Sequence, residues 1–245
     1  MIRFAVLAPF LFPTLAFGQV LSSTQHVFPW IVDGQMNSGA VYRTELVLSN
    51  PNFGFATCTL QFGGLSPRIA ALNGTSSTPL TVLNFAVFPS GYEVLRTLGN
   101  QPLASGYAVL NCSAPIYATS SFALFASTSA SSPTAETTLP SSFGNTTIEY
   151  LFDYRNEARL GIALANPYLT PATFSLTLTG SVNGVWLVTV PAAAVVTRFL
   201  DELVSLPPNA IGKVVISDWA FSRNVYSIGL KFSPSTFAPV LPNLR

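Results

Sequence analysis

The chain has little of the chemistry on which nucleic-acid-binding proteins depend. Only 9% of its 245 residues are charged, and its 11 Lys and Arg residues nearly balance its 10 Asp and Glu residues. The lysines, Lys213 and Lys231, and the scattered arginines form no basic cluster in the sequence. Because a protein must neutralise backbone phosphates to bind DNA or RNA, we predict no nucleic-acid partner.

Histidine is also scarce, and His26 is the only one. Any Ser-His-Asp or Cys-His arrangement would need this residue, and the sequence has no Gly-x-Ser-x-Gly segment to place a nucleophilic serine on a sharp turn. Two cysteines and one histidine do not complete the usual four ligands of a zinc site. Phosphate-binding glycine loops and the acidic spacing of a calcium loop are missing too. The sequence therefore predicts no catalytic residue, no metal site and no cofactor.

Glycoside hydrolysis is the enzymatic alternative, because it needs only two carboxylates across a cleft. Glu149, Asp153 and Glu157 lie close together in the sequence, and Asp201 and Glu202 follow on a later segment. Arginines interleave the first group, which favours a charge-balanced surface, and neighbouring carboxylates on a helix point apart. A glycan-active hydrolase thus stays the alternative to a non-catalytic protein.

Residues 1–18 have the layout of a secretory signal peptide. Arg3 precedes an apolar run, and the triplet Ala16-Phe17-Gly18 provides small residues at the expected cleavage point before Gln19. The run is too short for a comfortable membrane span and contains two prolines. We therefore predict a secreted, periplasmic or cell-surface protein without a membrane span after cleavage. Loss of Arg3 would leave basic and acidic residues equal in number.

The chain contains an internal sequence repeat. RTELVLSNPNFGFATCTLQFGG (43–64) and RLGIALANPYLTPATFSLTLTG (159–180) align without a gap and share an Asn-Pro pair, among other matches. Downstream, GYAVLNC (106–112) matches GKVVISD (212–218) more loosely, and SFALF (121–125) matches SIGLKF (227–232). A repeat of this length indicates two domains of about a hundred residues each.

The repeat and a change in composition set the predicted boundaries. Residues 126–147 are rich in Ser, Thr and Ala, which is typical of a loop or linker. We predict a first domain over 19–140, a linker over 141–147 and a second domain over 148–245. A terminal strand near Leu139, within the Ser-, Thr- and Ala-rich stretch, is compatible with either domain.

Short alternating segments inside the repeat predict strands. In 46–49 and 57–62, apolar residues alternate with polar or small ones, and the Asn-Pro pair that follows the first segment stops the strand, because proline cannot donate to a ladder. Only 197–206 is helical in pattern. Many short strands with turn signals and no alternating helices predict tandem antiparallel β-sandwiches, with one short helix in the second domain.

Cys58 and Cys112, the two cysteines, both fall on the inward phase of their predicted strands. After a signal peptide, the chain would fold in an oxidising compartment, so we predict a disulfide within the first domain. The second repeat has Phe174 and Asp218 at these places, so the bridge is optional to the fold.

The segments LVLSNP, ATCTLQF, GYAVLN, IALANP, ATFSLTL, TRFLDEL and GKVVIS resemble those of uncharacterised secreted proteins of soil bacteria that are built from paired Ig-like β-sandwich modules. The resemblance covers nearly all of the mature chain. It implies Ig-like sandwiches and export, and it carries no activity to transfer.

Together these observations predict an exported, non-catalytic binding or adhesion module. Its expected partner is a polysaccharide or a surface protein, because sandwiches present loops and edge strands to partners. Trp30, Tyr42 and Trp219 are the candidate ligand-stacking residues. A structural subunit of a surface layer or appendage is a second non-catalytic alternative, which a surface of low charge would suit.

Overall fold

The structure is a computed structural model that describes residues 21–71, 74–75, 78–142, 144–233 and 236–244. The predicted signal peptide, 1–18, lies outside the described residues. All pairings between strands are antiparallel, so the predicted all-β class is confirmed. The elements are β1 (Ser23–Gln35), β2 (Val41–Ser49), β3 (Ala56–Gly63), β4 (Ile69–Ala71), β5 (Gly74–Thr75), β6 (Val82–Val87), β7 (Tyr92–Thr97), β8 (Ala104–Phe125), β9 (Ala135–Pro140), β10 (Thr147–Asp153), η1 (Arg155–Glu157), β11 (Arg159–Asn166), β12 (Ala172–Gly180), β13 (Gly184–Val190), β14 (Ala194–Phe199), α1 (Leu200–Leu203), β15 (Ile211–Asp218), β16 (Tyr226–Ser233), β17 (Thr236–Val240) and β18 (Asn243–Leu244).

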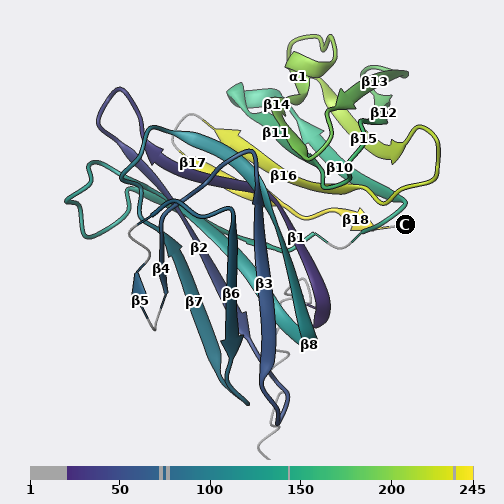
Figure 1. Cartoon of the computed structure of the whole chain (residues 1–245). Helices are drawn as coiled ribbons and strands as arrows, with labels where there is room; N and C mark the ends of the chain where they lie inside the picture. The colour runs from purple at the N-terminus through teal and green to yellow at the C-terminus, as the bar shows by residue number, and fades with distance from the viewer. Residues whose placement is uncertain (1–20, 72–73, 76–77, 143, 234–235, 245) are drawn as a thin grey trace, which may run out of the picture.

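The strands before residue 141, here called the N-terminal half, form one sheet. Its order is β5-β4-β7-β2-β1-β8-β3-β6, with β9 paired to β8 outside this path. The continuous strand β8 is 22 residues long, and its first part pairs with β1 and β3 while its second part pairs with β2 and β9. The sheet therefore curls into a half-barrel around one apolar core (Figure 1).

The strands after residue 146, the C-terminal half, form two sheets. One has the order β13-β12-β15-β10-β18 and the other β14-β11-β16-β17. Side chains from both sheets pack into a single core, including Tyr150, Leu164, Phe174 and Ile216. In this half two strands, β15 and β16, take the place of β8, and the turn 219–225 separates them.

The strand register repeats between the halves as the aligned sequences do. Cys58 on β3 lies opposite Cys112 on β8. Their counterparts in the repeat, Phe174 on β12 and Asp218 on β15, also lie opposite each other. The outer strands correspond too, since among the described strands β6 pairs only with β3 and β13 only with β12. The two copies therefore share their pairing scheme as well as their residues.

The repeated Asn-Pro turn has one structure in both halves. Asn50 and Asn166 are buried, and the side-chain oxygen of each accepts a backbone N–H two residues later. The Nδ2 of Asn50 donates to the carbonyl oxygens of Gly54, Val87 and Phe88 at 2.8, 3.1 and 3.2 Å. The Nδ2 of Asn166 donates to those of Thr170, Val190 and Pro191 at 2.9, 3.2 and 2.9 Å. Each asparagine thus ties its own turn to the next loop along the chain.

A repeated glycine allows two backbones to approach closely in each half. A Cβ on Gly106 would lie 2.1 Å from the carbonyl oxygen of Gly63, and one on Gly212 would lie 2.4 Å from that of Thr179. No side chain fits at such distances, which explains why both copies have glycine there.

The cysteines form the predicted disulfide between Cys58 and Cys112, with 54 residues separating them. Cys58 is buried in the apolar core of the N-terminal half. The bridge joins neighbouring strands of one sheet, so it fixes the register of β3 against β8.

The predicted helix over 197–206 is wrong in extent. Only Leu200–Leu203 is α-helical, and Thr197–Phe199 ends strand β14. Val195 and Val196 pair with β11, and β-branched side chains favour this extended backbone. The hydrogen bonds of the strand therefore override the helical spacing of the apolar residues.

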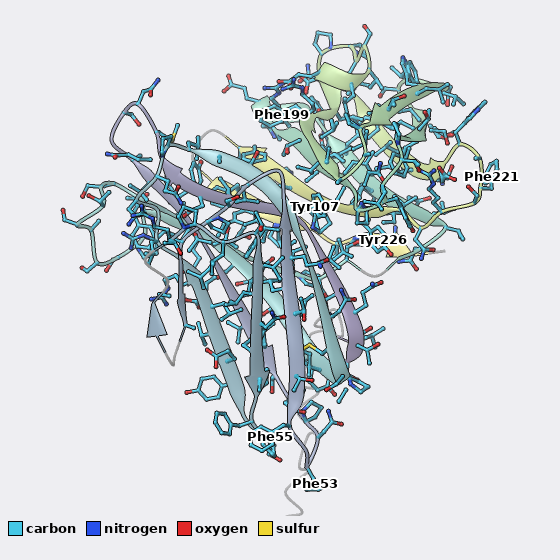
Figure 2. The ribbon with its side chains drawn as sticks, viewed as in Figure 1. Phe53, Phe55, Tyr107, Phe199, Phe221 and Tyr226 are labelled. Carbon is cyan, nitrogen blue, oxygen red and sulfur yellow. A yellow bond between two sulfur atoms is a disulfide. The ribbon has the colours of Figure 1, made fainter. Side chains whose placement is uncertain are left out.

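The two halves pack against each other through apolar side chains. Val32, Phe122 and Leu139 meet residues of β11 and β16 in one cluster, and Tyr107 and Tyr226 belong to a second (Figure 2). Ser142, which lies between the halves, forms hydrogen bonds to both. Its backbone pairs with that of Val27, and its Oγ accepts the backbone N–H of Ser227 at 3.2 Å. The domain boundaries, with a linker at 141–147, stay a prediction, and the described part of that segment contacts both halves.

Among the described residues, no helix is long and apolar enough to cross a membrane.

Candidate functional site

Trp30, one of the predicted ligand residues, lines a pocket where β1 meets the four-stranded sheet. The pocket has a volume of about 270 Å³, and its walls are mainly apolar, including Ala163, Phe199, Ile228 and Phe232. The indole ring of Trp30 packs on Phe122 with ring centroids 4.8 Å apart. Its Nε1 is shielded from solvent and has no hydrogen-bond partner among the described residues, so Trp30 offers the pocket carbon atoms rather than a donor. Small-molecule sites usually enclose about 300–1,000 Å³ and contain several convergent polar groups, which makes this pocket a weak candidate.

A charged network centred on Arg159 includes Phe199 and Glu202, which line this pocket. The Arg159 guanidinium donates to Asp201 at 2.7 Å, reaches Glu202 at 3.3 Å and lies over the ring of Phe199. The hydroxyl of Tyr154 donates to Asp201 at 2.9 Å. Burial and the adjacent carboxylate raise the pKa of Tyr154 well above its usual range, so this phenol stays protonated. The network ties α1 to β11, which is a structural role.

The other two predicted ligand residues lie in different places. Tyr42 is partly buried in the cluster between the halves, near Trp30, and burial raises its pKa. Trp219 begins the turn between β15 and β16 and is 55% exposed. Trp219 is therefore the one member of the predicted trio that is largely open to solvent. Ligand binding by all three residues stays a prediction.

Four of the five candidate carboxylates of a hydrolase have basic partners, and the fifth, Glu157, is exposed. Lys213 Nζ lies 3.1 Å from Glu149, and Arg155 lies 2.7 Å from Asp153. Hydrogen bonds from Arg155 hold the pKa of Asp153 well below its usual range. A general acid needs the opposite shift. The predicted interleaving of arginines is thus seen at Arg155, while Arg159 pairs instead with the carboxylates of α1.

His26, the only histidine, is fully buried at the start of β1. Its Nε2 lies 3.0 Å from the carbonyl oxygens of Ser23 and Ile116, and its Nδ1 lies 2.7 Å from Ser141 Oγ. Because carbonyls only accept, Nε2 carries the proton and Nδ1 accepts from the serine. Burial lowers the pKa of His26, which keeps the ring neutral. These contacts join β1, β8 and the segment after β9.

Across the described part of the chain, no three His, Cys, Asp or Glu side chains gather closely enough to hold a metal ion.

The far end of the N-terminal half exposes a group of aromatic side chains, here called the aromatic end. Phe53 is 97% exposed, and Phe55 packs beside Phe88 with ring centroids 5.2 Å apart. Tyr92 and Tyr117 lie on either side of Ser49 in the sheet, which sets them about 10 Å apart, or two strand spacings. Figure 2 shows Phe53 and Phe55 at the end of this half that points away from the C-terminal half.

The loops of the aromatic end are tied together by hydrogen bonds. Besides its side-chain bonds, Asn50 donates its backbone N–H to the carbonyl oxygen of Gly91 at 2.9 Å, and Ser90 donates to that of Asn52 at 3.0 Å. Ser90 has a φ of 49°, in the left-handed region, and Ala193 has the same value at the corresponding place in the second copy. The aromatic side chains therefore project from an ordered pair of loops.

Neither loop of the aromatic end contains a charged residue over 50–57 or 87–92. The corresponding loop of the C-terminal half exposes a single large apolar side chain, Leu169, which is 90% exposed. The loop geometry therefore belongs to both copies, but in the C-terminal half the exposed aromatic side chains, Trp219 and Phe221, lie on the neighbouring turn 219–225 and not on this pair of loops.

No family model, curated protein or solved structure matches the chain. Any assignment of function therefore rests on the sequence and on the geometry of these surfaces.

Sequence reasoning overlooked the aromatic end because phenylalanine and tyrosine in a β-rich chain usually belong to the core. A signal was nonetheless present. Phe53 and Phe55 follow the Asn-Pro turn, where the chain leaves the sheet, and they are separated by a glycine. Aromatic residues in a turn segment have no strand partner to cover them.

Proposed function

We propose that the protein is an exported, non-catalytic binding module that holds an uncharged polysaccharide on its aromatic end. The observation that carries this proposal is the exposure of several aromatic rings on loops without a charged residue. The faces of aromatic rings carry partial negative charge and attract the weakly positive C–H groups of sugar rings. An ordered platform loses little entropy on binding, which favours this surface over a mobile loop.

The chemistry of the platform favours a neutral glycan. An acidic polysaccharide would need basic side chains to offset its desolvation, and the loops at 50–57 and 87–92 have none. Tyr92, 63% exposed, and Tyr117, 41% exposed, present hydroxyl groups beside their rings. These groups suit hydrogen bonds to sugar hydroxyls while the rings stack.

The proposed framework of this module is a tandem of two Ig-like β-sandwich domains. Two observations support it: the register of β3 with β8 recurs in β12 with β15, and two sheets share one core in the C-terminal half. The curled sheet of the N-terminal half would be a variant in which the two layers stay joined through β8. Export is supported by the disulfide, because such bridges persist in oxidising compartments. Export with cleavage of the signal peptide predicts a mature N-terminus at Gln19, which N-terminal sequencing of the exported protein would check.

The test is affinity electrophoresis of the oxidised protein in gels that contain a neutral β-glucan, a neutral xylan or an acidic pectin. We expect retardation in at least one neutral gel and none in pectin. Replacing Phe55 or Tyr92 by alanine should weaken the binding about tenfold, which corresponds to about 1.4 kcal/mol for one stacked ring.

Leu169→Ala is the matched control, since it removes the exposed apolar side chain from the same loop of the other copy. Its retardation should equal that of the unmodified protein. Absence of binding to every neutral polysaccharide, or equal binding by Phe55→Ala and the unmodified chain, would refute the proposal.

A further inference from the structure

Strand β13 lies at an open edge of the five-stranded sheet. Among the described strands it pairs only with β12, in an unbroken register from Ala172 opposite Val190 to Leu178 opposite Gly184. One side of its backbone therefore presents N–H and C=O groups to no neighbouring strand. Such an edge is a template for another extended strand.

Other described edge strands carry the features that usually prevent edge pairing. β17 contains Pro239, β14 contains Arg198, and β5 and β18 are two residues long. β13 has seven residues with no proline, no charge and no bulge. Its counterpart β6 is also uncharged but places Asn84 where β13 has Leu187.

Two of the three exposed side chains of β13 are apolar, and the third is the uncharged Thr189. Val185 is 56% exposed and Leu187 is 53% exposed, and both project from the same face. No charged residue occurs anywhere between Arg159 and Arg198. A charged partner strand would bury its charge against this surface without a counter-ion, so the strand that fits is uncharged.

We propose that β13 pairs antiparallel with β13 of a second copy of this chain. A strand paired with itself about a twofold axis is self-complementary, because each copy supplies the same backbone groups and the same uncharged side chains. The pair would join two five-stranded sheets edge to edge and place Val185 and Leu187 of both copies in one apolar row. This interface is separate from the aromatic end, so glycan binding and dimer formation are independent.

Sedimentation equilibrium of the purified, oxidised chain tests the proposal. We expect a reversible monomer–dimer equilibrium. Leu187→Lys, which sets like charges together across the twofold axis, should weaken the dimer at least tenfold. Thr189→Lys, at an already exposed polar position of β13, is the second variant and should act in the same direction. Far-UV circular dichroism would verify that both variants keep the β fold.

Val82→Lys is the matched control on β6, where Val82 is 45% exposed, and it should leave the equilibrium unchanged. Three results would overturn the proposal. These are a monomer at every concentration up to about 1 mM, a dimer that survives both lysine variants of β13, and open-ended assemblies that Val82→Lys also abolishes. The last result would assign the contact to β13 against β6.

Discussion

The N-terminal and C-terminal halves share a strand register but divide their layers differently, and the difference centres on one pair of positions. In the N-terminal half Cys58 and Cys112 are bridged, and β8 continues past Cys112 from one part of the sheet to the other. In the C-terminal half Asp218 takes the place of Cys112 and ends β15. Its Oδ2 accepts the backbone N–H groups of Ser222 and Arg223 and the Ser222 hydroxyl.

The comparison shows how one strand pattern produces two arrangements. A carboxylate at the end of a strand gathers the N–H groups of a tight turn, which breaks the strand and separates two sheets. A cysteine at the same place accepts no such bonds, so the strand runs on and the sheet stays whole. In the N-terminal half the disulfide, and not a turn, fixes the register of β3 against β8 at this place.

Removing the disulfide should have the largest effect on this comparison. We expect the double variant Cys58→Ala with Cys112→Ala to lower the free energy of unfolding by about 4 kcal/mol, because closing a 54-residue loop restricts the unfolded chain. Urea denaturation, with reduction of the unmodified protein as an independent route to the same state, measures the loss. A change below about 1 kcal/mol would show that strand pairing alone sets the register of the N-terminal half.

The buried asparagines test the shared part of the two halves. Asn50→Ala and Asn166→Ala each remove an amide that donates to three carbonyl oxygens. Each substitution should therefore lower the free energy of unfolding by about 3 kcal/mol. Thermal and urea unfolding of the two variants measure the losses. Equal losses would confirm that the turn is equivalent in both copies, and a difference above about 1.5 kcal/mol would break the equivalence.

Asp218 tests the part that the halves do not share. Asp218→Ala should destabilise the protein by about 2 kcal/mol through the loss of three acceptor contacts in the turn 219–225. Asp218→Asn keeps an acceptor and should recover part of this loss. Amide hydrogen exchange at Ser222 and Arg223 provides the local readout, and unchanged protection in Asp218→Ala would contradict this account of the turn.

The smallest expected effect is a pH dependence from His26, which has no histidine counterpart in the second copy. Burial lowers the pKa of folded His26 below the unfolded value of about 6.5, so the unfolded chain takes up the proton first as the pH falls. Stability should therefore decrease as the pH falls below about 6.5, with a slope of at most about 1.4 kcal/mol per pH unit. Denaturation curves between pH 5 and 8 measure this slope.

His26→Gln should remove that pH dependence. Persistence of the full slope in this variant would assign the titration to another group.

Much of the framework was predictable because it is repeated. Alternation predicted strands over 46–49 and 57–62, and Leu48 and Leu60 on these strands are buried. Two aligned Asn-Pro pairs also pointed to one kind of turn, and the inward phase of both cysteines pointed to the bridge. In each case the signal is local, set by a few neighbouring residues, so a sequence read without coordinates contains it.

Features that depend on distant segments were not predictable. The match of SFALF with SIGLKF is out of register, since β2 and β11 set Tyr117 in correspondence with Tyr226. The run 197–206 has helical spacing, but β11 pulls its first residues into a ladder. Exposure of Phe53 and Phe55 follows from where the turn lies in the finished sheet, because the same residues within a strand would be covered.

The apolar contact between the halves also has a consequence for the order of events during synthesis. Every strand from β1 to β9 precedes β10 in the chain, so the residues of the N-terminal sheet emerge first. Until β11 and β16 emerge, Val32, Phe122 and Leu139 have no cover from the C-terminal half. Before the C-terminal half folds, the newly made chain therefore exposes this apolar surface. A chaperone that binds apolar surfaces would protect the chain most at that stage.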